Sequence, residues 1–194
     1  GFPVSIPSAY SIMVRSMDMS EVPLKAQKAR LASRRLASLD TATKNRALRL
    51  MSESLLDQKT VIFSENQKDL SAGRAKGMTP ALLDRLELSE KRVKGIVEGL
   101  KQVETLPDPV GEVLEETTRP NGLHIKKVRV PIGVIAIIFD SRPNVTVDSS
   151  SLCLKSGNAT VLRGGSDAIH SNIAIWKVIR EAVKRAGAPE DAIQ

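Results

Sequence analysis

The sequence predicts an α/β fold, in which a helical N-terminal segment leads through a β-hairpin into the start of a Rossmann-like parallel sheet. Two continuous apolar runs, residues 134–139 and 159–162, are typical of strands buried on both faces of a parallel sheet. Residues 145–155 between them suit a crossover helix that Gly157 would end. Strand, helix and strand in this order form a βαβ unit with a right-handed crossover.

The composition fits a globular protein with an aliphatic core, because 41% of the 194 residues are hydrophobic but only 3% are aromatic. No apolar run approaches the roughly 20 residues that span a bilayer, so no membrane partner is expected. The single cysteine excludes an internal disulfide and fits a reducing, cytoplasmic compartment. The net charge of +7 is spread over several segments, which argues against nucleic acid and favours an anionic small molecule.

The first hundred residues are predicted to be mostly helical. Residues 1–20 carry two prolines and no helical periodicity, which favours a remnant of an expression vector or a loosely ordered natural extension. In the helical part, residues 21–106, apolar positions recur at helical spacing. The predicted helices cover residues 22–39, 42–58, 60–73, a segment that starts at Pro80, and 89–103. Asp40 and Thr79 are predicted N-caps, and Ser89 is predicted to begin the last of these helices.

Residues 107–130 are predicted to form a β-hairpin. Residues 111–118 and 123–130 alternate in a strand-like pattern. The pair Asn121 and Gly122 between them is a strong turn signal.

Residues 131–194 are expected to be the first part of a nucleotide-binding domain. The βαβ unit is followed by a predicted helix over about residues 171–186, which Gly187 ends. Ligands of open α/β sheets bind beyond the carboxyl ends of the strands. Those ends carry two polar loops here, residues 140–144 and 163–166.

The second of these loops is the candidate cofactor site. It consists of Arg163, Gly164, Gly165 and Ser166. Glycines let the backbone approach a ligand closely, and the following helix would offer free N–H groups to an anion. The loop could equally be an ordinary strand–helix turn, because it matches neither the G-x-G-x-x-G fingerprint nor a P-loop.

The first loop holds two candidate site residues, Arg142 and Asn144. Asn144 could donate a hydrogen bond to a developing oxyanion, or it could cap the helix that follows. Arg142 could clamp a carboxylate or a phosphate, or it could pair with an acidic neighbour.

The residues alone do not indicate a nucleophile. Cys153 lies in the middle of a predicted helix, where an inert core thiol is expected. His124 and His170 are too far apart to form a metal site, so no metal is predicted.

Several blocks spread over residues 22–194 together resemble a known family. The blocks are residues 130–135 (VPIGVI), 141–147 (SRPNVTV), 154–158 (LKSGN), 162–168 (LRGGSDA) and 171–172 (SN), preceded by 66–70 (NQKDL), 82–86 (LLDRL) and 108–113 (DPVGEV). They resemble the N-terminal portion of the gamma-glutamyl phosphate reductases, or glutamate-5-semialdehyde dehydrogenases, of the aldehyde dehydrogenase superfamily.

The resemblance implies an NADPH-dependent reduction of L-glutamyl 5-phosphate to L-glutamate 5-semialdehyde and phosphate, in proline biosynthesis. In such enzymes a cysteine thiolate takes the acyl group, phosphate leaves, and hydride resolves the thioester. In the wider aldehyde dehydrogenase superfamily, a lysine that contacts the adenosine ribose stands where Arg163 stands here. Superfamily members that prefer NAD often carry, where Ser166 stands, a glutamate that binds both ribose hydroxyls. The resemblance therefore implies that Arg163 and Ser166 select NADP. It also implies a homo-oligomer.

One departure from the family concerns the nucleophile. The catalytic cysteine of the family lies downstream of the Ser-Gly-Asn block in a separate catalytic domain, and no cysteine follows Cys153 here. The nucleophile and that domain are absent from this chain, which is expected to be inactive alone. A non-catalytic nucleotide-binding or oligomerisation module is the alternative. The incomplete sheet leaves an edge and an apolar face uncovered, so the chain is expected to be aggregation-prone or stabilised by self-association.

Overall fold

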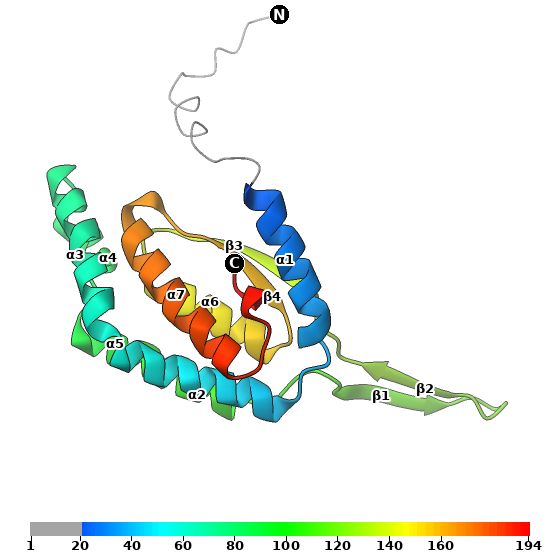
Figure 1. Cartoon of the computed structure of the whole chain (residues 1–194). Helices are drawn as coiled ribbons and strands as arrows, with labels where there is room; N and C mark the ends of the chain where they lie inside the picture. Colours follow the sequence, from blue (N-terminus) through cyan, green and yellow to red (C-terminus); the bar gives the residue numbers. More distant parts are fainter. Residues whose placement is uncertain (1–20) are drawn as a thin grey trace, which may run out of the picture.

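The computed structural model describes residues 21–194 (Figure 1), so the expectation for residues 1–20 lies outside the described residues. The helices are α1 (Glu21–Leu36), α2 (Thr41–Asp57), α3 (Lys59–Ala75), α4 (Pro80–Leu86), α5 (Glu90–Thr105), α6 (Asn144–Lys155) and α7 (Ile169–Arg185). The strands are β1 (Val113–Thr118), β2 (His124–Val128), β3 (Val134–Ile138) and β4 (Ala159–Arg163). This order confirms the predicted fold class, whereas the predicted domain boundaries stay predictions.

The N-terminal helices begin where local capping chemistry allows. The Asp40 carboxylate accepts a hydrogen bond of 2.6 Å from the Thr43 amide at the start of α2. The hydroxyls of Thr79 and Ser89 accept from backbone amides in the first turns of α4 and α5. These side chains stabilise orphan N–H groups, so the helix starts predicted from the sequence are confirmed.

The core is aliphatic and lies where α7 packs against α2, α3 and α6, while α5 covers α2 and α6 (Figure 1). Its fully buried large side chains come from widely separated elements. They include Leu36, Leu48, Met51, Leu100, Leu154, Ile175 and Ile179. Burying a side chain of this size stabilises the fold by about 1.5–3 kcal/mol.

The parallel sheet joins β3 to β4 in a register that runs from Val134 opposite Ala159 to Ile138 opposite Arg163. The tight step from α6 into β4 needs Gly157, whose φ is +74° and where a Cβ would come within 2.9 Å of the Pro131 ring. On the other side of β4, Ile193 forms an isolated parallel bridge with Thr160.

The prediction that β3 is buried on both faces is wrong. Its residues are half-buried or exposed, and 76% of Ile138 is open to solvent. Within residues 21–194, β3 pairs with β4 alone, so its outer edge has no neighbouring strand. A continuous apolar run indicates that a strand is suited to burial on both faces. It does not identify the elements that would pack against those faces.

The hairpin of β1 and β2 is confirmed, with Gly122 at a φ of +86° in its turn. It extends away from the helical body (Figure 1), and every residue of both strands is exposed. Alternation is typical of a half-buried strand, but neither face of this hairpin is covered within residues 21–194.

Two buried lysines tie α2, α5 and α6 together. Lys44 of α2 is fully buried, and its ammonium donates to both carboxylate oxygens of Asp108, at 2.8 and 3.1 Å. Lys155, the last residue of α6, donates to the Asn45 side chain at 2.6 Å and to the Glu104 carbonyl at 2.8 Å. We call these residues the lysine network.

Ionisation in the lysine network follows from burial and hydrogen bonding. Burial raises the pKa of Asp108, but hydrogen bonds from Lys44, the Val110 amide and Thr41 outweigh it, so the pKa is lowered. Burial lowers the pKa of Lys155, against the attraction of Asp108 and Glu104.

Candidate functional site

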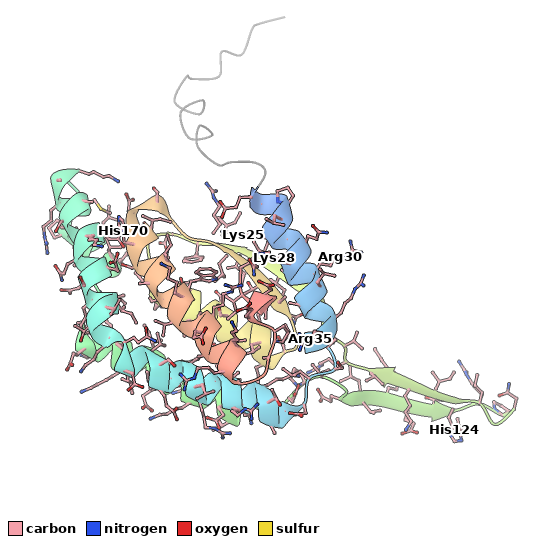
Figure 2. The ribbon with its side chains drawn as sticks, in the orientation of Figure 1. Lys25, Lys28, Arg30, Arg35, His124 and His170 are labelled. Carbon is pink, nitrogen blue, oxygen red and sulfur yellow. The ribbon has the colours of Figure 1, made fainter. Side chains whose placement is uncertain are left out.

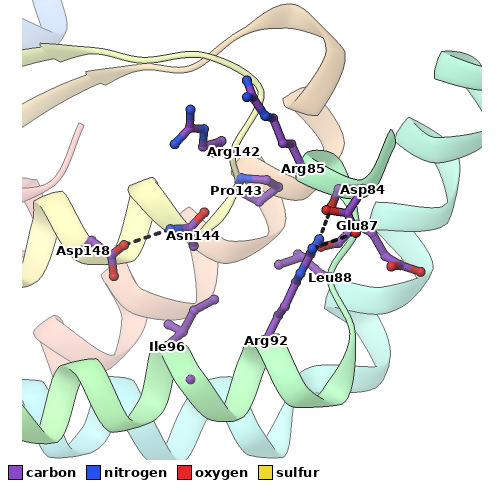
Figure 3. Close-up of a pocket in the computed structure, with 11 residues that line it drawn as sticks. Asp84, Arg85, Glu87, Leu88, Arg92, Ile96, Arg142, Pro143, Asn144 and Asp148 are labelled. Atoms are coloured by element: carbon purple, nitrogen blue, oxygen red, sulfur yellow. Dashed lines mark hydrogen bonds and ion pairs between the residues drawn. The ribbon is translucent and has the colours of Figure 1, made fainter. Parts of the chain in front are cut away.

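A cleft of about 550 Å³ lies between α4, α5 and the start of α6 (Figure 3). Its lining consists of Asp84, Arg85, Glu87, Leu88, Arg92, Gly95, Ile96, Arg142, Pro143, Asn144 and Asp148. The structure therefore brings the predicted site residues Arg142 and Asn144 into one cavity. The opposite wall comes from the N-terminal helical part.

Asn144 does not cap α6. Pro143 occupies the N-cap position and makes no side-chain cap, whereas Asn144 is the first residue of the helix. The Asn144 amide instead donates to the Asp148 carboxylate one turn later, at 3.0 Å. The capping alternative is therefore wrong, and one amide hydrogen is left over to donate elsewhere.

Arg142 pairs with an acidic neighbour, as one of its two alternatives predicted. Its Nε lies 3.2 Å from Asp140 Oδ2, and both side chains are about half exposed. The closest approach to Asp140 is made by Nε.

The opposite wall adds two arginines that the sequence analysis did not single out. Arg92 is occupied, because it donates to the Asp84 carboxylate at 2.9 Å and to the carbonyls of Asp84 and Glu87. Arg85 forms no ion pair within residues 21–194 and is exposed at the mouth of the cleft. For Arg85, the local signal in the sequence was the charged pair of Asp84 and Arg85 inside the block LLDRL, residues 82–86. That block contributed only to the family resemblance and was not assigned to a site.

Asp148 is the other residue that the sequence analysis missed. Surrounding protein atoms partly desolvate its carboxyl group and raise its pKa, while the hydrogen bond from Asn144 opposes that rise. The i,i+4 spacing of an amide and a carboxylate at a helix start could have suggested this contact.

The two polar loops lie side by side at the carboxyl edge of the sheet, as predicted. A Cβ on Gly165 would come within 2.7 Å of the Ser141 hydroxyl, and one on Gly164 would overlap the Asn172 amide of α7. Both glycines are therefore needed for close packing of the loop itself. Arg163 and Ser166 are exposed beside them.

The expectation that the helix after this loop offers free N–H groups is wrong for the start of α7. A 3-10 turn (Ser166–Ala168) comes first, and α7 begins at Ile169 rather than near Ser171. The buried Asp69 carboxylate of α3 accepts from the Ser171 amide at 2.7 Å and from the His170 amide at 3.2 Å. An internal anion thus fills the position that a phosphate would take.

A second cavity, of about 470 Å³, lies on the other side of the loop, against α1 and α7. Gly164 contributes to its lining together with Phe139, Leu162 and Trp176, so it is mostly apolar. Neither Arg163 nor Ser166 lines either cavity. The structure therefore separates the cleft of Asn144 from the space beside the glycine loop.

Cys153 is buried, with 5% of its surface exposed, and burial raises the pKa of its thiol. Both features oppose formation of a reactive thiolate.

The two histidines lie far apart, His124 on the hairpin and His170 at the start of α7 (Figure 2). Within the described part of the chain, no group of three or more His, Cys, Asp or Glu residues is arranged to hold a metal ion. Among the same residues, no helix combines the length and the apolar character needed to span a bilayer.

Comparison with known proteins shows strong similarity to one enzyme. The chain is 52% identical over 176 residues to gamma-glutamyl phosphate reductase of Anoxybacillus flavithermus, which covers 91% of the chain and 43% of the relative. It is 56% identical to the enzyme of that name from Caldanaerobacter subterraneus, over 90% of the chain and 42% of the relative. The chain thus spans about two fifths of the length of these relatives. No protein-family model matches it.

Solved structures agree with the sequence comparison. The crystal structure of gamma-glutamyl phosphate reductase from Thermotoga maritima superposes with a TM-score of 0.89 at 44% identity, covering 90% of this chain and 42% of that one. A probable aldehyde dehydrogenase from Listeria monocytogenes, at 14% identity, a TM-score of 0.63 and coverage of 90% and 36%, shows that the fold is shared. In sequence and in fold, the chain is therefore similar to the N-terminal portion of gamma-glutamyl phosphate reductases, within the aldehyde dehydrogenase fold.

Proposed function

We propose that this chain provides part of an oxidoreductase that converts L-glutamyl 5-phosphate to L-glutamate 5-semialdehyde and phosphate, with NADPH as reductant, in cytoplasmic proline biosynthesis. The observation that carries the proposal is the identity of 50–56% to enzymes named gamma-glutamyl phosphate reductase over about 90% of the chain. The cleft that joins Arg142 to Asn144 is consistent with an anionic acyl substrate.

In this proposal Asn144 donates its remaining amide hydrogen to the carbonyl oxygen of the substrate as negative charge develops there. Arg142, two residues earlier, binds the phosphate of the same acyl group through its guanidinium. The thiolate that takes the acyl group belongs to another part of the complete enzyme, because the Cys153 thiol is buried and its pKa is raised.

Bound NADPH would supply the hydride. Arg163 and Ser166 would hold its 2′-phosphate, since both side chains are exposed and Arg163 forms no ion pair within residues 21–194. Gly164 and Gly165 would let the cofactor approach the backbone. The pyrophosphate would not bind at the start of α7, because Asp69 occupies those amides.

The proposal is tested with the complete enzyme, assayed in reverse. L-glutamate 5-semialdehyde, phosphate and NADP should together yield NADPH, and omission of phosphate should stop the reaction. An enzyme that reduces NADP equally well without phosphate would not be forming an acyl phosphate, and the proposed reaction would be wrong.

The chain of residues 1–194 by itself should show no turnover in this assay. Activity of the purified chain that Cys153→Ala abolishes would overturn both this expectation and the assignment of Cys153 to the core.

We also propose that the enzyme is a homo-oligomer. In support, the hairpin exposes apolar side chains on both strands, among them Val113, Leu114 and Ile125. Light scattering of the complete enzyme tests this, and a monomer at micromolar concentration would contradict it. The alternative, a non-catalytic module, requires a native protein that ends near Gln194, which its measured mass would reveal.

A further inference from the structure

We propose that Asp148 is a positioning residue, which holds the Asn144 amide in the orientation that donates to the developing oxyanion. This inference rests on the proposed function and deepens it, because Asn144 is the oxyanion donor in that proposal. Asp148 would act on the reaction only through Asn144 and would not itself touch the substrate.

The first observation is the hydrogen bond between the two side chains. The amide nitrogen of Asn144 donates to Asp148 Oδ2 at 3.0 Å, and both residues line the cleft (Figure 3). Within residues 21–194, neither side chain forms a second hydrogen bond or an ion pair. In this part of the chain, the contact is therefore what orients the amide at the cleft.

The second observation is the partner that Asp148 takes. Two nearby carboxylates pair with guanidinium groups, since Asp84 lies 2.9 Å from Arg92 and Asp140 lies 3.2 Å from Arg142. Asp148 binds a neutral amide instead. Its charge therefore acts on the orientation of that amide rather than on a neighbouring cation.

A carboxylate can select one of the two orientations of an amide. An ionised carboxylate has no hydrogen to donate, so it binds the nitrogen of the Asn144 amide and repels its oxygen. The two orientations differ by half a turn about the last side-chain torsion, which is otherwise only broadly restricted. The reversed amide would present its oxygen, instead of a hydrogen, to the negative charge that develops in the substrate. Asp148 disfavours that reversal and leaves the second amide hydrogen for the substrate.

The helix that carries both side chains fixes their spacing. Residues four positions apart lie one above the other on the same face of a helix. Between them, Thr146 and Val147 are buried, and Lys155 anchors the far end of α6. The backbone under the pair is thus held by the core, so the carboxylate keeps its position relative to the amide.

The test uses the complete enzyme in the reverse direction. The variants are Asp148→Asn, which keeps the shape but can also donate, and Asp148→Glu, which keeps the carboxylate. Asp148→Asn is also combined with Asn144→Ala. Glu53→Gln is the control for the loss of one negative charge, because Glu53 is exposed on α2 and does not line the cleft. The melting temperature, kcat and the KM values for semialdehyde and phosphate are measured for each.

We expect Asp148→Asn to lower kcat by a factor on the order of 10, since one hydrogen bond to a charged group is lost. Both KM values should stay within about twofold, as for an interaction that matters in the transition state. The melting temperature should not change. Asp148→Glu should recover most of kcat, and Glu53→Gln should match the unmodified enzyme.

The double variant separates positioning from a direct effect. In the Asn144→Ala background there is no amide to orient, so adding Asp148→Asn should change kcat by less than about twofold. If Asp148 acted on the substrate directly, its replacement would lower kcat by the same factor in both backgrounds.

Three outcomes overturn the role of Asp148 alone. They are an unchanged kcat in Asp148→Asn, an equal fall of kcat in both backgrounds, and a fall that Asp148→Glu shares together with a lower melting temperature. The last outcome would assign Asp148 to the stability of α6. If the unmodified enzyme shows no phosphate-dependent turnover, the proposed function fails instead. If Asn144→Ala keeps full kcat, Asn144 is not the donor, and the role of Asp148 fails with it.

Discussion

The two helices that follow the parallel strands begin in opposite ways. α6 starts at Asn144 after a proline, without a side-chain cap, and faces the cleft. α7 starts against the buried carboxylate of Asp69, which accepts hydrogen bonds from its first turn. A helix that follows a parallel strand can therefore begin facing a cleft, as α6 does, or begin hydrogen-bonded to a carboxylate from another element, as α7 does.

The open start of α6 is matched by a fixed end. Lys155 at its C-terminus is bonded to Asn45 and Glu104, next to the buried pair of Lys44 and Asp108. A helix held firmly at one end can present a side chain at its other end, here Asn144, to a ligand without loss of position, which preorganised sites require.

The fixed end of α6 should show the largest effect on stability. Asp108→Asn leaves the buried Lys44 without its counter-charge, and such a loss costs about 3–5 kcal/mol. The free energy of unfolding in urea measures it. Asp167→Asn, which breaks the exposed pair with Lys76, is the control and should cost less than about 1 kcal/mol. Equal losses would show that the lysine network does not hold α6.

The effect of Asp108→Asn should depend on pH. The folded-state pKa of Asp108 lies below its ordinary value of 3.8, so its stabilisation is present above that value. It is lost as pH falls through the lowered pKa, where the folded protein also takes up the proton. The difference in unfolding free energy between Asp108→Asn and the unmodified protein should therefore be constant at neutral pH and shrink below about 3.8. A difference that stays constant in acid would contradict the role of the charge.

The open start of α6 should matter for the reaction rather than for stability. In the complete enzyme Asn144→Ala should lower kcat by about 100- to 1,000-fold, the usual effect of removing one oxyanion donor. The melting temperature should hardly change, because Asn144 is not a cap. Gln27→Ala on the exposed surface of α1 is the control. A lower melting temperature with an unchanged kcat would contradict this prediction, because it would show that Asn144 stabilises α6 and does not take part in the reaction.

The closed start of α7 should behave in the opposite way. Asp69→Ala removes a buried acceptor of several hydrogen bonds and should cost about 2 kcal/mol of unfolding free energy. Asp148→Ala at the start of α6 is its counterpart and should cost less than about 1 kcal/mol, since that residue is exposed and its carboxylate accepts a single hydrogen bond, from Asn144. Similar losses in the two variants would mean that both helix starts are anchored.

The smallest effect should come from the loop before α7. Ser166→Glu places a carboxylate where the 2′-phosphate of NADP would bind, and should reduce the preference for NADPH over NADH by roughly tenfold or more. The measurement is the ratio of kcat/KM for the two cofactors in the complete enzyme. Ser149→Glu on α6 is a control of equal charge. An unchanged ratio would place the 2′-phosphate elsewhere.

The sequence was sufficient for features that depend on near neighbours. Asp40 and Thr79 accept hydrogen bonds from amides three residues on, and Gly157 ends α6 through its own positive φ, so these helix ends were predicted. The side-by-side loops of Arg142 and Gly165 followed from the rule that parallel strands share a carboxyl edge.

Features that depend on distant segments were not predicted. Asp69 lies 102 positions from Ser171, and no local pattern links a carboxylate in α3 to the start of α7. Arg85 reaches the cleft only because α4 packs against α3 while α5 packs against α6. The solvent exposure of β3 likewise depends on what covers it, which its own residues do not encode.

The burial of Lys44 and Lys155 has a consequence for chemical labelling. Reagents that acylate amines react with accessible, uncharged lysines, so these two should stay unmodified while exposed ones such as Lys91 and Lys101 react. Their labelling would require α2, α5 and α6 to separate. The rate at which mass spectrometry detects modified Lys155 would thus report how often this corner of the protein opens.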